Sequence, residues 1–95
     1  MILRVDEKGE RIPLTVADFD REKGSVTIVF QAVGFTTKKL AALHKGEFIT
    51  DCVGPLGMPT EFGSPKKAIV IGGGVGCAIA YPQAKALYNM GVDTT

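Results

Sequence analysis

The sequence has few of the residues that build metal centres and hydrolytic active sites. It contains two cysteines, Cys52 and Cys77, and one histidine, His44. The cysteines lack the spacing of a metal-binding motif and no Ser-His-Asp set is evident, so we expect neither a metal site nor a catalytic histidine. His44 closes a polar segment, where we expect a solvated side chain or one that interacts with a helix end.

Net charge and long apolar runs are also scarce. Eleven Lys and Arg residues against ten Asp and Glu residues give a net charge of +1, which offers no case for nucleic acid or an acidic membrane surface as a partner. No apolar run approaches the roughly 20 residues that cross a membrane. Residues 1–5 are too short for a signal peptide. Cysteines without a disulfide framework favour reduced thiols in the cytoplasm.

The most informative stretch is a glycine-rich turn between a strand and a helix. Residues 68–71 are apolar without alternation, which predicts a strand buried on both faces. Glycines follow at 72, 73, 74 and 76, and residues 78–90 have helical character. This layout presents backbone N–H groups and a positive helix end to a phosphate. The G-x-G-x-x-G fingerprint and the P-loop are both absent, so a plain tight turn is the other interpretation. Cys77 would be a reactive thiol or a small buried residue there.

The rest of the chain predicts short antiparallel strands. We expect them at residues 2–5, 11–18, 25–33 and 47–53, and the third alternates most clearly. Pro13 cannot donate a ladder hydrogen bond, so its strand lies at an edge or a bulge. Thr36 or Thr37 can cap a short helix that Gly46 ends. Residues 58–66 are interpreted as a linker.

Four motifs in this order resemble the ferredoxin–NADP reductase superfamily: Arg11 to Thr15, Val33 to Thr37, Gly54 to Gly57 and Gly72 to Gly76. The branch that looks most similar contains the electron-transfer subunits of dihydroorotate dehydrogenase, sulfide dehydrogenase and NADH-dependent ferredoxin:NADP oxidoreductase. The resemblance runs from Ile2 to the last residue. The order of the four motifs is more specific than any one of them.

The resemblance implies an FAD site whose first segment is the strand around Pro13. Leu14 would lie against the isoalloxazine ring, and Thr15 would hydrogen-bond near its N5 edge as the catalytic, tuning residue. Pro13 would shape the strand. Arg11 is the candidate partner of the pyrophosphate, because a guanidinium forms paired bonds to phosphate oxygens. Ile12 occupies the usual arginine position and a one-residue shift changes the face of a strand, so an exposed strand-end arginine is the alternative.

The resemblance also implies a second FAD segment, in which Val33, Gly34, Thr36 and Thr37 match the family's residues before a short helix. N–H groups at a helix start, with hydroxyls beside them, suit a pyrophosphate. An ordinary N-cap is the other interpretation, because it stabilises a helix by about 1 kcal/mol without any ligand.

The glycine turn resembles the family's NAD(P)H site, which would consist of Gly72, Gly73, Gly74, Val75 and Gly76. Ile79 stands where the family commonly has proline, and we expect Pro82 in the first helical turn. The helix should pack through Ala84, Leu87 and Tyr88. We expect no further strands, no counterpart of the residue that selects NAD or NADP, and no counterpart of the family's iron–sulfur cysteines.

These observations predict a mainly β fold with α elements. Residues 1–62 would form a partial reductase-type FAD-binding antiparallel β-barrel with a short helix, and residues 63–95 the first βα unit of a doubly wound NAD(P)-binding domain. The chain looks like a fragment of such a subunit. An unpaired sheet edge predicts self-association.

The resemblance implies a flavin-dependent oxidoreductase subunit. It would transfer electrons between NAD(P)H and an iron–sulfur protein or catalytic partner subunit through FAD. A non-catalytic fragment that serves as a flavin-binding or interaction module is an alternative for this chain. A plain nucleotide-phosphate binder is a third, although a lone βα unit cannot enclose a ligand. Whether the chain itself is an enzyme stays open.

Overall fold

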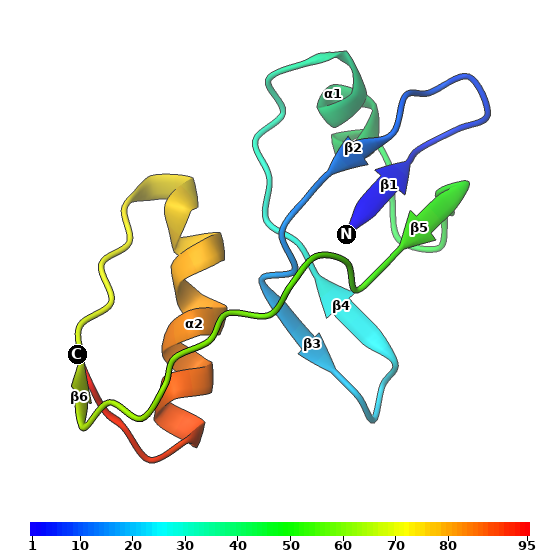
Figure 1. Cartoon of the computed structure of the whole chain (residues 1–95). Coiled ribbons are helices and arrows are strands. Elements are labelled where there is room, and N and C mark those ends of the chain that lie inside the picture. The colour runs from blue at the N-terminus through cyan, green and yellow to red at the C-terminus, as the bar shows by residue number, and fades with distance from the viewer. The chain divides into compact units, whose positions relative to one another are not determined.

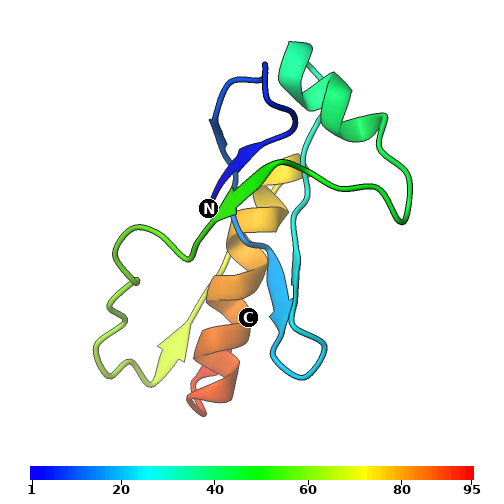
Figure 2. The same cartoon turned by 90° about the vertical axis from the view of Figure 1, so that its right-hand side faces the viewer.

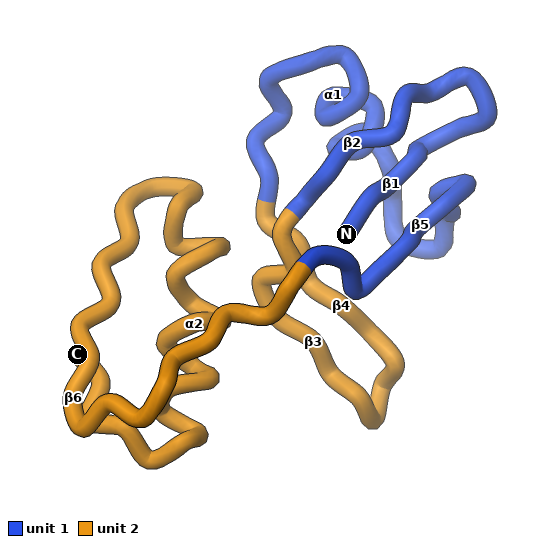
Figure 3. The backbone as a smooth tube through the Cα atoms, in the orientation of Figure 1, with its two compact units in different colours: residues 1–14, 30–57 blue, residues 15–29, 58–95 orange.

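The computed structural model describes all 95 residues, which form two compact units. Unit 1 comprises residues 1–14 and 30–57, and unit 2 comprises residues 15–29 and 58–95 (Figure 3). The predicted domain boundary after residue 62 lies in the irregular segment between β5 and β6. That boundary stays a prediction.

Unit 1 is built on a three-stranded antiparallel sheet in the order β2-β1-β5 (Figure 1). Its strands are β1 (Ile2–Arg4), β2 (Ile12–Pro13) and β5 (Asp51–Val53). Leu3 stands opposite Ile12 on one side and Cys52 on the other. Leu3 and Val5 are both buried. Since alternate residues of a strand point to one face, these two side chains mark the core face of the sheet.

The short helix α1 (Phe35–Ala41) completes unit 1. Gly34 is its N-cap, and the hydroxyl of Thr37 accepts hydrogen bonds from the N–H groups of Gly34 (2.9 Å) and Val33 (3.1 Å). A threonine therefore does cap this helix, but from inside the first turn. The helix stops at Ala41, before the predicted end at Gly46.

Unit 2 contains a β-hairpin and a strand–turn–helix–strand segment. The hairpin pairs β3 (Asp18–Asp20) with β4 (Ser25–Thr27). The second segment runs from β6 (Lys67–Ala68) through the 3-10 turn η1 (Gly74–Gly76) and helix α2 (Cys77–Asn89) to β7 (Asp93–Thr94). Strand β6 lies alongside α2 in both views (Figures 1 and 2). The buried side chains of this segment are Ala78, Leu87 and Val92.

The predicted fold class is confirmed, because short antiparallel strands and a short helix precede one βα unit with a parallel strand pair. The strands are shorter than predicted. Of residues 25–33, for which the sequence predicts one alternating strand, only Ser25–Thr27 form a strand, and all three are exposed. Beyond β3 and β4 the pairing ends after one more hydrogen bond, from the Ala17 N–H to the Thr27 carbonyl at 2.8 Å.

The prediction of a fully buried strand at residues 68–71 is wrong. Only Lys67–Ala68 form β6, and the side chains of Ile69 and Ile71 are 77% and 89% exposed. The reason is that β6 pairs only with the two residues of β7. A parallel strand becomes buried only when neighbouring strands and helices cover both of its faces.

Helix α2 differs from its prediction in two places. Pro82 lies inside the helix and not in its first turn, because the helix already begins at Cys77. The proline removes the N–H that would bond the carbonyl of Ala78. Tyr88 is 75% exposed, whereas Leu87 is buried, so Tyr88 does not belong to the packing face.

A second parallel strand, which the sequence analysis did not expect, follows α2. Residues Asp93–Thr94 form β7, and Lys67 stands opposite Asp93 in the parallel register. None of the helices has the length and apolar character that crossing a membrane requires.

Candidate functional site

The glycine turn is brought together as predicted between β6 and α2. Gly73 is extended, with φ −138° and ψ 135°, and its carbonyl accepts a hydrogen bond from the N–H of Gly76 at 3.0 Å. Gly74 has a φ of +55°, the left-handed region that favours glycine. Gly76 has helical angles and serves as the N-cap of α2. Val75 completes η1 and is 43% exposed.

The glycines of this turn differ in the space around them. A Cβ added at Gly72 would lie 3.0 Å from the Cβ of Ala80, 3.2 Å from the Sγ of Cys77 and 3.3 Å from its Cα. A Cβ at Gly73, Gly74 or Gly76 would meet no atom within 4 Å. Gly72 therefore permits the close approach of strand and helix. The other three glycines leave the outer side of the turn open.

The start of α2 is available to an anion. No side chain caps it, and no acidic residue stands in its first turn. The N–H groups of Gly76 and Cys77 already bond carbonyls of the turn before them, and the helix dipole favours negative charge at this end. Cys77 is exposed and reduced, and its sulfur borders Gly72. The interpretation of Cys77 as a small buried residue is therefore wrong.

The candidate flavin residues of β2 lie on two different faces. In the register of the sheet, Ile12 stands opposite the buried Leu3, and Pro13 stands opposite Ile2. Since faces alternate along a strand, Arg11 and Pro13 share the outer face, while Leu14 follows Ile12 on the core side. The Leu14 backbone extends the ladder, since its N–H donates to the Met1 carbonyl at 2.9 Å.

Arg11 belongs to a row of charges across the outer face. The Asp51 carboxylate accepts a hydrogen bond from the Nε of Arg4 at 2.6 Å, and the Nη2 of Arg11 lies 3.9 Å from the same Oδ2 atom. The longer distance is an ion-pair contact without a hydrogen bond. The Arg11 side chain is 65% exposed, so its N–H donors remain free for a phosphate or water.

Thr15, the predicted tuning residue, opens the first segment of unit 2, whereas Arg11, Pro13 and Leu14 belong to unit 1. Its side chain is exposed and its hydroxyl makes no hydrogen bond. The backbone just after it is fixed, because Ala17 is buried and bonded to Thr27. Thr15 is thus a free hydroxyl next to an anchored strand start.

The second flavin segment lies at the start of α1, and its two threonines have different partners. Thr36 is buried and donates from its hydroxyl to the Oε1 atom of Glu10 at 3.4 Å. The Thr37 hydroxyl accepts the two N–H bonds of the cap and donates to the Gly34 carbonyl at 3.2 Å. Val33 is 74% exposed. The N–H groups of Val33 and Gly34 and both threonine hydroxyls are therefore already hydrogen-bonded within the fold.

Two ion pairs join elements that lie far apart in the sequence. The Nζ of Lys39 lies 2.8 Å from Oδ2 of Asp6, and this hydrogen bond lowers the pKa of Asp6 below its ordinary value. The Nζ of Lys85 lies 2.8 Å from Oδ1 of Asp18. Their hydrogen bond lowers the pKa of Asp18 and raises that of Lys85. Sequence reasoning missed both, because no local pattern signals pairs 33 and 67 residues apart.

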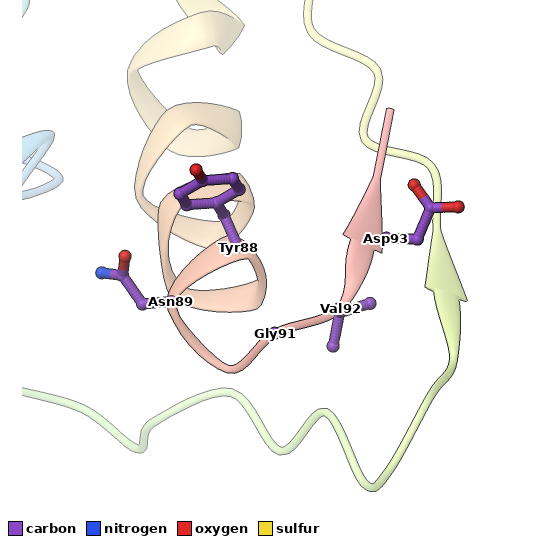
Figure 4. Close-up of a pocket in the computed structure, with 5 residues that line it drawn as sticks. All are labelled: Tyr88, Asn89, Gly91, Val92 and Asp93. Carbon is purple, nitrogen blue, oxygen red and sulfur yellow. The ribbon is translucent and has the colours of Figure 1, made fainter.

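An open concavity of about 540 Å³ lies at the other end of α2, lined by Tyr88, Asn89, Gly91, Val92 and Asp93. Helix α2 has 13 residues, so about 20 Å of helix separate this end from the glycine turn. The Asn89 and Asp93 side chains point to opposite sides (Figure 4). These groups do not converge on a common point and do not coincide with the predicted site. No group of three or more His, Cys, Asp and Glu residues could hold a metal ion.

Comparisons with known proteins give a consistent set of relatives, although no protein-family model matches the chain. A Clostridium beijerinckii protein described as an uncharacterised protein in the adh 3' region is 52% identical over 99 residues, covering 97% of this chain. A Thermotoga maritima homolog of the electron transfer subunit of dihydroorotate dehydrogenase B (NAD(+)) is 47% identical over the whole chain. The chain spans about a third of the length of these relatives, 33% and 34%.

A solved structure described as the NADH-dependent reduced ferredoxin-NADP oxidoreductase, reported for its flavin-based electron bifurcation, has a chain with the same fold. It matches with a TM-score of 0.93 and 47% identity, covering 98% of this chain and 34% of that chain. Identity at this level over nearly the whole sequence goes beyond a shared fold.

Proposed function

We propose that this polypeptide is the flavin- and nucleotide-contacting part of a ferredoxin–NADP reductase-like electron-transfer subunit. The resemblance to such subunits extends along the chain. The subunit would pass electrons between NAD(P)H and an iron–sulfur protein or catalytic partner subunit through FAD. Because the chain spans a third of its relatives, the complete reaction is assigned to the subunit. The cytoplasm is the expected location.

The observation that carries the proposal is the open outer side of the glycine turn. Gly73 and Gly76 have backbone angles that any residue adopts, and a Cβ at either position would touch nothing. No requirement of the fold explains these two glycines. Close approach of a ligand's phosphates to the backbone does explain them, because a side chain would occupy the same space. The start of α2 supplies the positive end of a helix dipole.

The flavin end fits the residues present in part. Arg11 offers free guanidinium donors to a diphosphate, whereas the N–H groups of Val33 and Gly34 already donate to the Thr37 hydroxyl. The Thr36 hydroxyl is already used within the fold, so its contribution would come from its backbone. Leu14 would contact the ring system, with Pro13 shaping the strand, and Thr15 would hydrogen-bond near the N5 edge. Bound FAD would supply hydride acceptance and single-electron release, and the chain would position it.

A non-catalytic interaction module is the second candidate. The exposed Ile69 and Ile71 side chains next to β6 favour it, because exposed apolar groups beside a strand edge suit association with another polypeptide. The chain would then contribute scaffold and contacts to a complex while another polypeptide completes the redox site.

An absorption spectrum distinguishes the two candidates. The purified chain is mixed with FAD, desalted and scanned, and then treated with NADH without oxygen. We expect retained flavin absorbance that NADH bleaches, and we expect Gly73→Ala and Gly76→Ala to slow bleaching while flavin retention is unchanged. A colourless protein would contradict the flavin assignment and favour the interaction module. Bleaching at the wild-type rate in both variants would contradict the assignment of the glycine turn.

A further inference from the structure

The hairpin β3–β4 has little apolar burial to hold it in place. Its strands have three residues each, and every residue of β4 is exposed. The cross-strand pair of Phe19 and Val26 is exposed too, at 53% and 52%. Ala17, just before β3, is buried. Since a two-stranded hairpin is at best marginally stable in water, contacts with the rest of unit 2 must fix its position.

One ion pair joins the hairpin to helix α2. The Nζ of Lys85 lies 2.8 Å from Oδ1 of Asp18, the first residue of β3, and the same oxygen accepts the Phe19 N–H at 2.9 Å. The Nζ atom also lies 5.8 Å from the ring centroid of Tyr81, one helical turn earlier. Cation–π attraction operates at this distance. The start of β3 is thus held by a lysine 67 residues further along the chain.

This ion pair lies three residues from Thr15, the residue assigned to the N5 edge of the flavin. The Ala17 N–H donates to the Thr27 carbonyl at 2.8 Å, and Asp18 stands opposite Thr27 in the register. Two consecutive residues are therefore fixed, one by the partner strand and the other by Lys85. Three residues of extended chain span at most about 10 Å. The place where β3 begins therefore limits where the Thr15 hydroxyl can lie.

We propose that Lys85 and Asp18 are positioning residues for the flavin, which hold the start of β3 so that the Thr15 hydroxyl meets the N5 edge. This inference rests on the proposed function, because that function assigns Thr15 to the flavin. Neither side chain of the pair touches the flavin in this scheme. Their effect is exerted through Thr15, so it should vanish when residue 15 has no hydroxyl. That dependence distinguishes a positioning role from a general loss of stability.

Lys23 provides a matched control within the same hairpin. It is exposed and forms neither an ion pair nor a cation–π contact. Lys85→Met and Lys23→Met each remove one positive charge and keep a flexible apolar stem, yet only Lys85→Met releases Asp18. Asp18→Asn breaks the ion pair from the other side and keeps an oxygen that can accept the Phe19 N–H. Lys85→Arg keeps a cation that can bond Asp18.

The test measures two quantities in the 95-residue chain. The first is the ratio of oxidised to reduced bound flavin against a reference dye, during slow reduction by xanthine and xanthine oxidase, which needs no NADH. The second is the hydrogen exchange of residues 15–20 without FAD. We expect Lys85→Met and Asp18→Asn to change the ratio about two- to tenfold, as loss of one hydrogen bond would, and to speed exchange. Lys23→Met and Lys85→Arg should leave both quantities near wild type.

The comparison with Thr15→Ala tests the route of the effect. Thr15→Ala alone should change the ratio in the same direction, and adding Lys85→Met to it should change the ratio no further. An unchanged ratio in Thr15→Ala would overturn the inference. A further change of the same size in the double variant would also overturn it, because Lys85 would then act on the flavin without Thr15. If Lys85→Met does not fold, Asp18→Asn gives the same comparison.

The outcomes separate this inference from the function on which it rests. A wild-type ratio in Lys85→Met, with FAD retained, would overturn the positioning role while the flavin assignment stands. Equal changes in Lys23→Met and Lys85→Met would overturn it too, because they would reflect net charge. If the wild-type chain retains no FAD, the proposed function and the positioning role both fail, and faster exchange in Lys85→Met then reports only on the attachment of the hairpin.

Discussion

Replacing Gly72 by alanine should destabilise the protein, whereas the same change at Gly73 should not. The added methyl group at Gly72 would sit 3.0 Å from the Ala80 Cβ and 3.3 Å from the Cys77 Cα. Neither neighbour is the end of a flexible side chain, so the turn or helix α2 must shift by a few tenths of an ångström. Overpacking of this kind costs about 1–3 kcal/mol. In a domain of this size it should lower the melting temperature by about 5–20 °C.

Gly73 and Gly76 are the matched controls for Gly72, because a Cβ at either position meets no atom within 4 Å. Gly73→Ala and Gly76→Ala add a methyl group to open space at φ −138° and −60°, which alanine adopts without strain. Such changes usually stabilise by about 0.4–1 kcal/mol, because they restrict the unfolded chain. Thermal unfolding followed by circular dichroism would measure all three variants under one condition.

A second substitution identifies the contact responsible. Cys77→Ala in the Gly72→Ala background removes the sulfur at 3.2 Å and leaves the other two contacts in place. We therefore expect partial recovery of the melting temperature, as a coupling between neighbours predicts. A melting temperature of Gly72→Ala within a degree of that of Gly73→Ala would refute the packing argument. It would mean that turn and helix can separate at no cost.

Three further predictions concern unit 2. The hydrogen bond from Lys85 lowers the pKa of Asp18. The pair therefore stabilises the fold above about pH 4, and this effect is lost as the pH falls through the folded-state pKa. Lys85→Met should lower the melting temperature at pH 7 but not near pH 2, and a difference between variant and wild type that stays the same at both pH values would contradict the linkage. Thr15→Ala should slow flavin reduction by NADH while FAD is retained, and an unchanged rate would remove Thr15 from the reaction. The exposed Ile69 and Ile71 should make the chain self-associate at tens of micromolar, and Ile71→Lys should reduce this in sedimentation; a sharp wild-type monomer peak would contradict it.

The features predictable from sequence are those that depend on local chemistry. The glycines after an apolar run do form a strand-to-helix turn, and Pro13 does lie on an edge strand of the sheet. Each follows from backbone freedom or from a missing N–H group. The prediction of a capping threonine in α1 is correct for Thr37, but the N-cap residue is Gly34, because Thr37 acts from the third helical position.

The features that escaped prediction depend on what surrounds a residue. Ile69 and Ile71 have the composition of a buried strand, but burial requires covering layers, and β7 alone does not provide them. The partner of Lys39 is Asp6 and that of Lys85 is Asp18. Nothing in the composition near a lysine names a carboxylate dozens of residues away. Only the pairing of distant elements creates these contacts.

The structure distinguishes the four glycines of the turn, which the sequence motif does not. In sequence, four glycines are equivalent, and a fold requirement or a ligand explains them equally well. In space they separate, since Gly72 is required by packing against Ala80 and Cys77, and Gly74 by its positive φ. Gly73 and Gly76 satisfy neither requirement. Their open side is the part of the turn that a phosphate would use, so the nucleotide hypothesis rests on two residues whose replacement should leave stability intact.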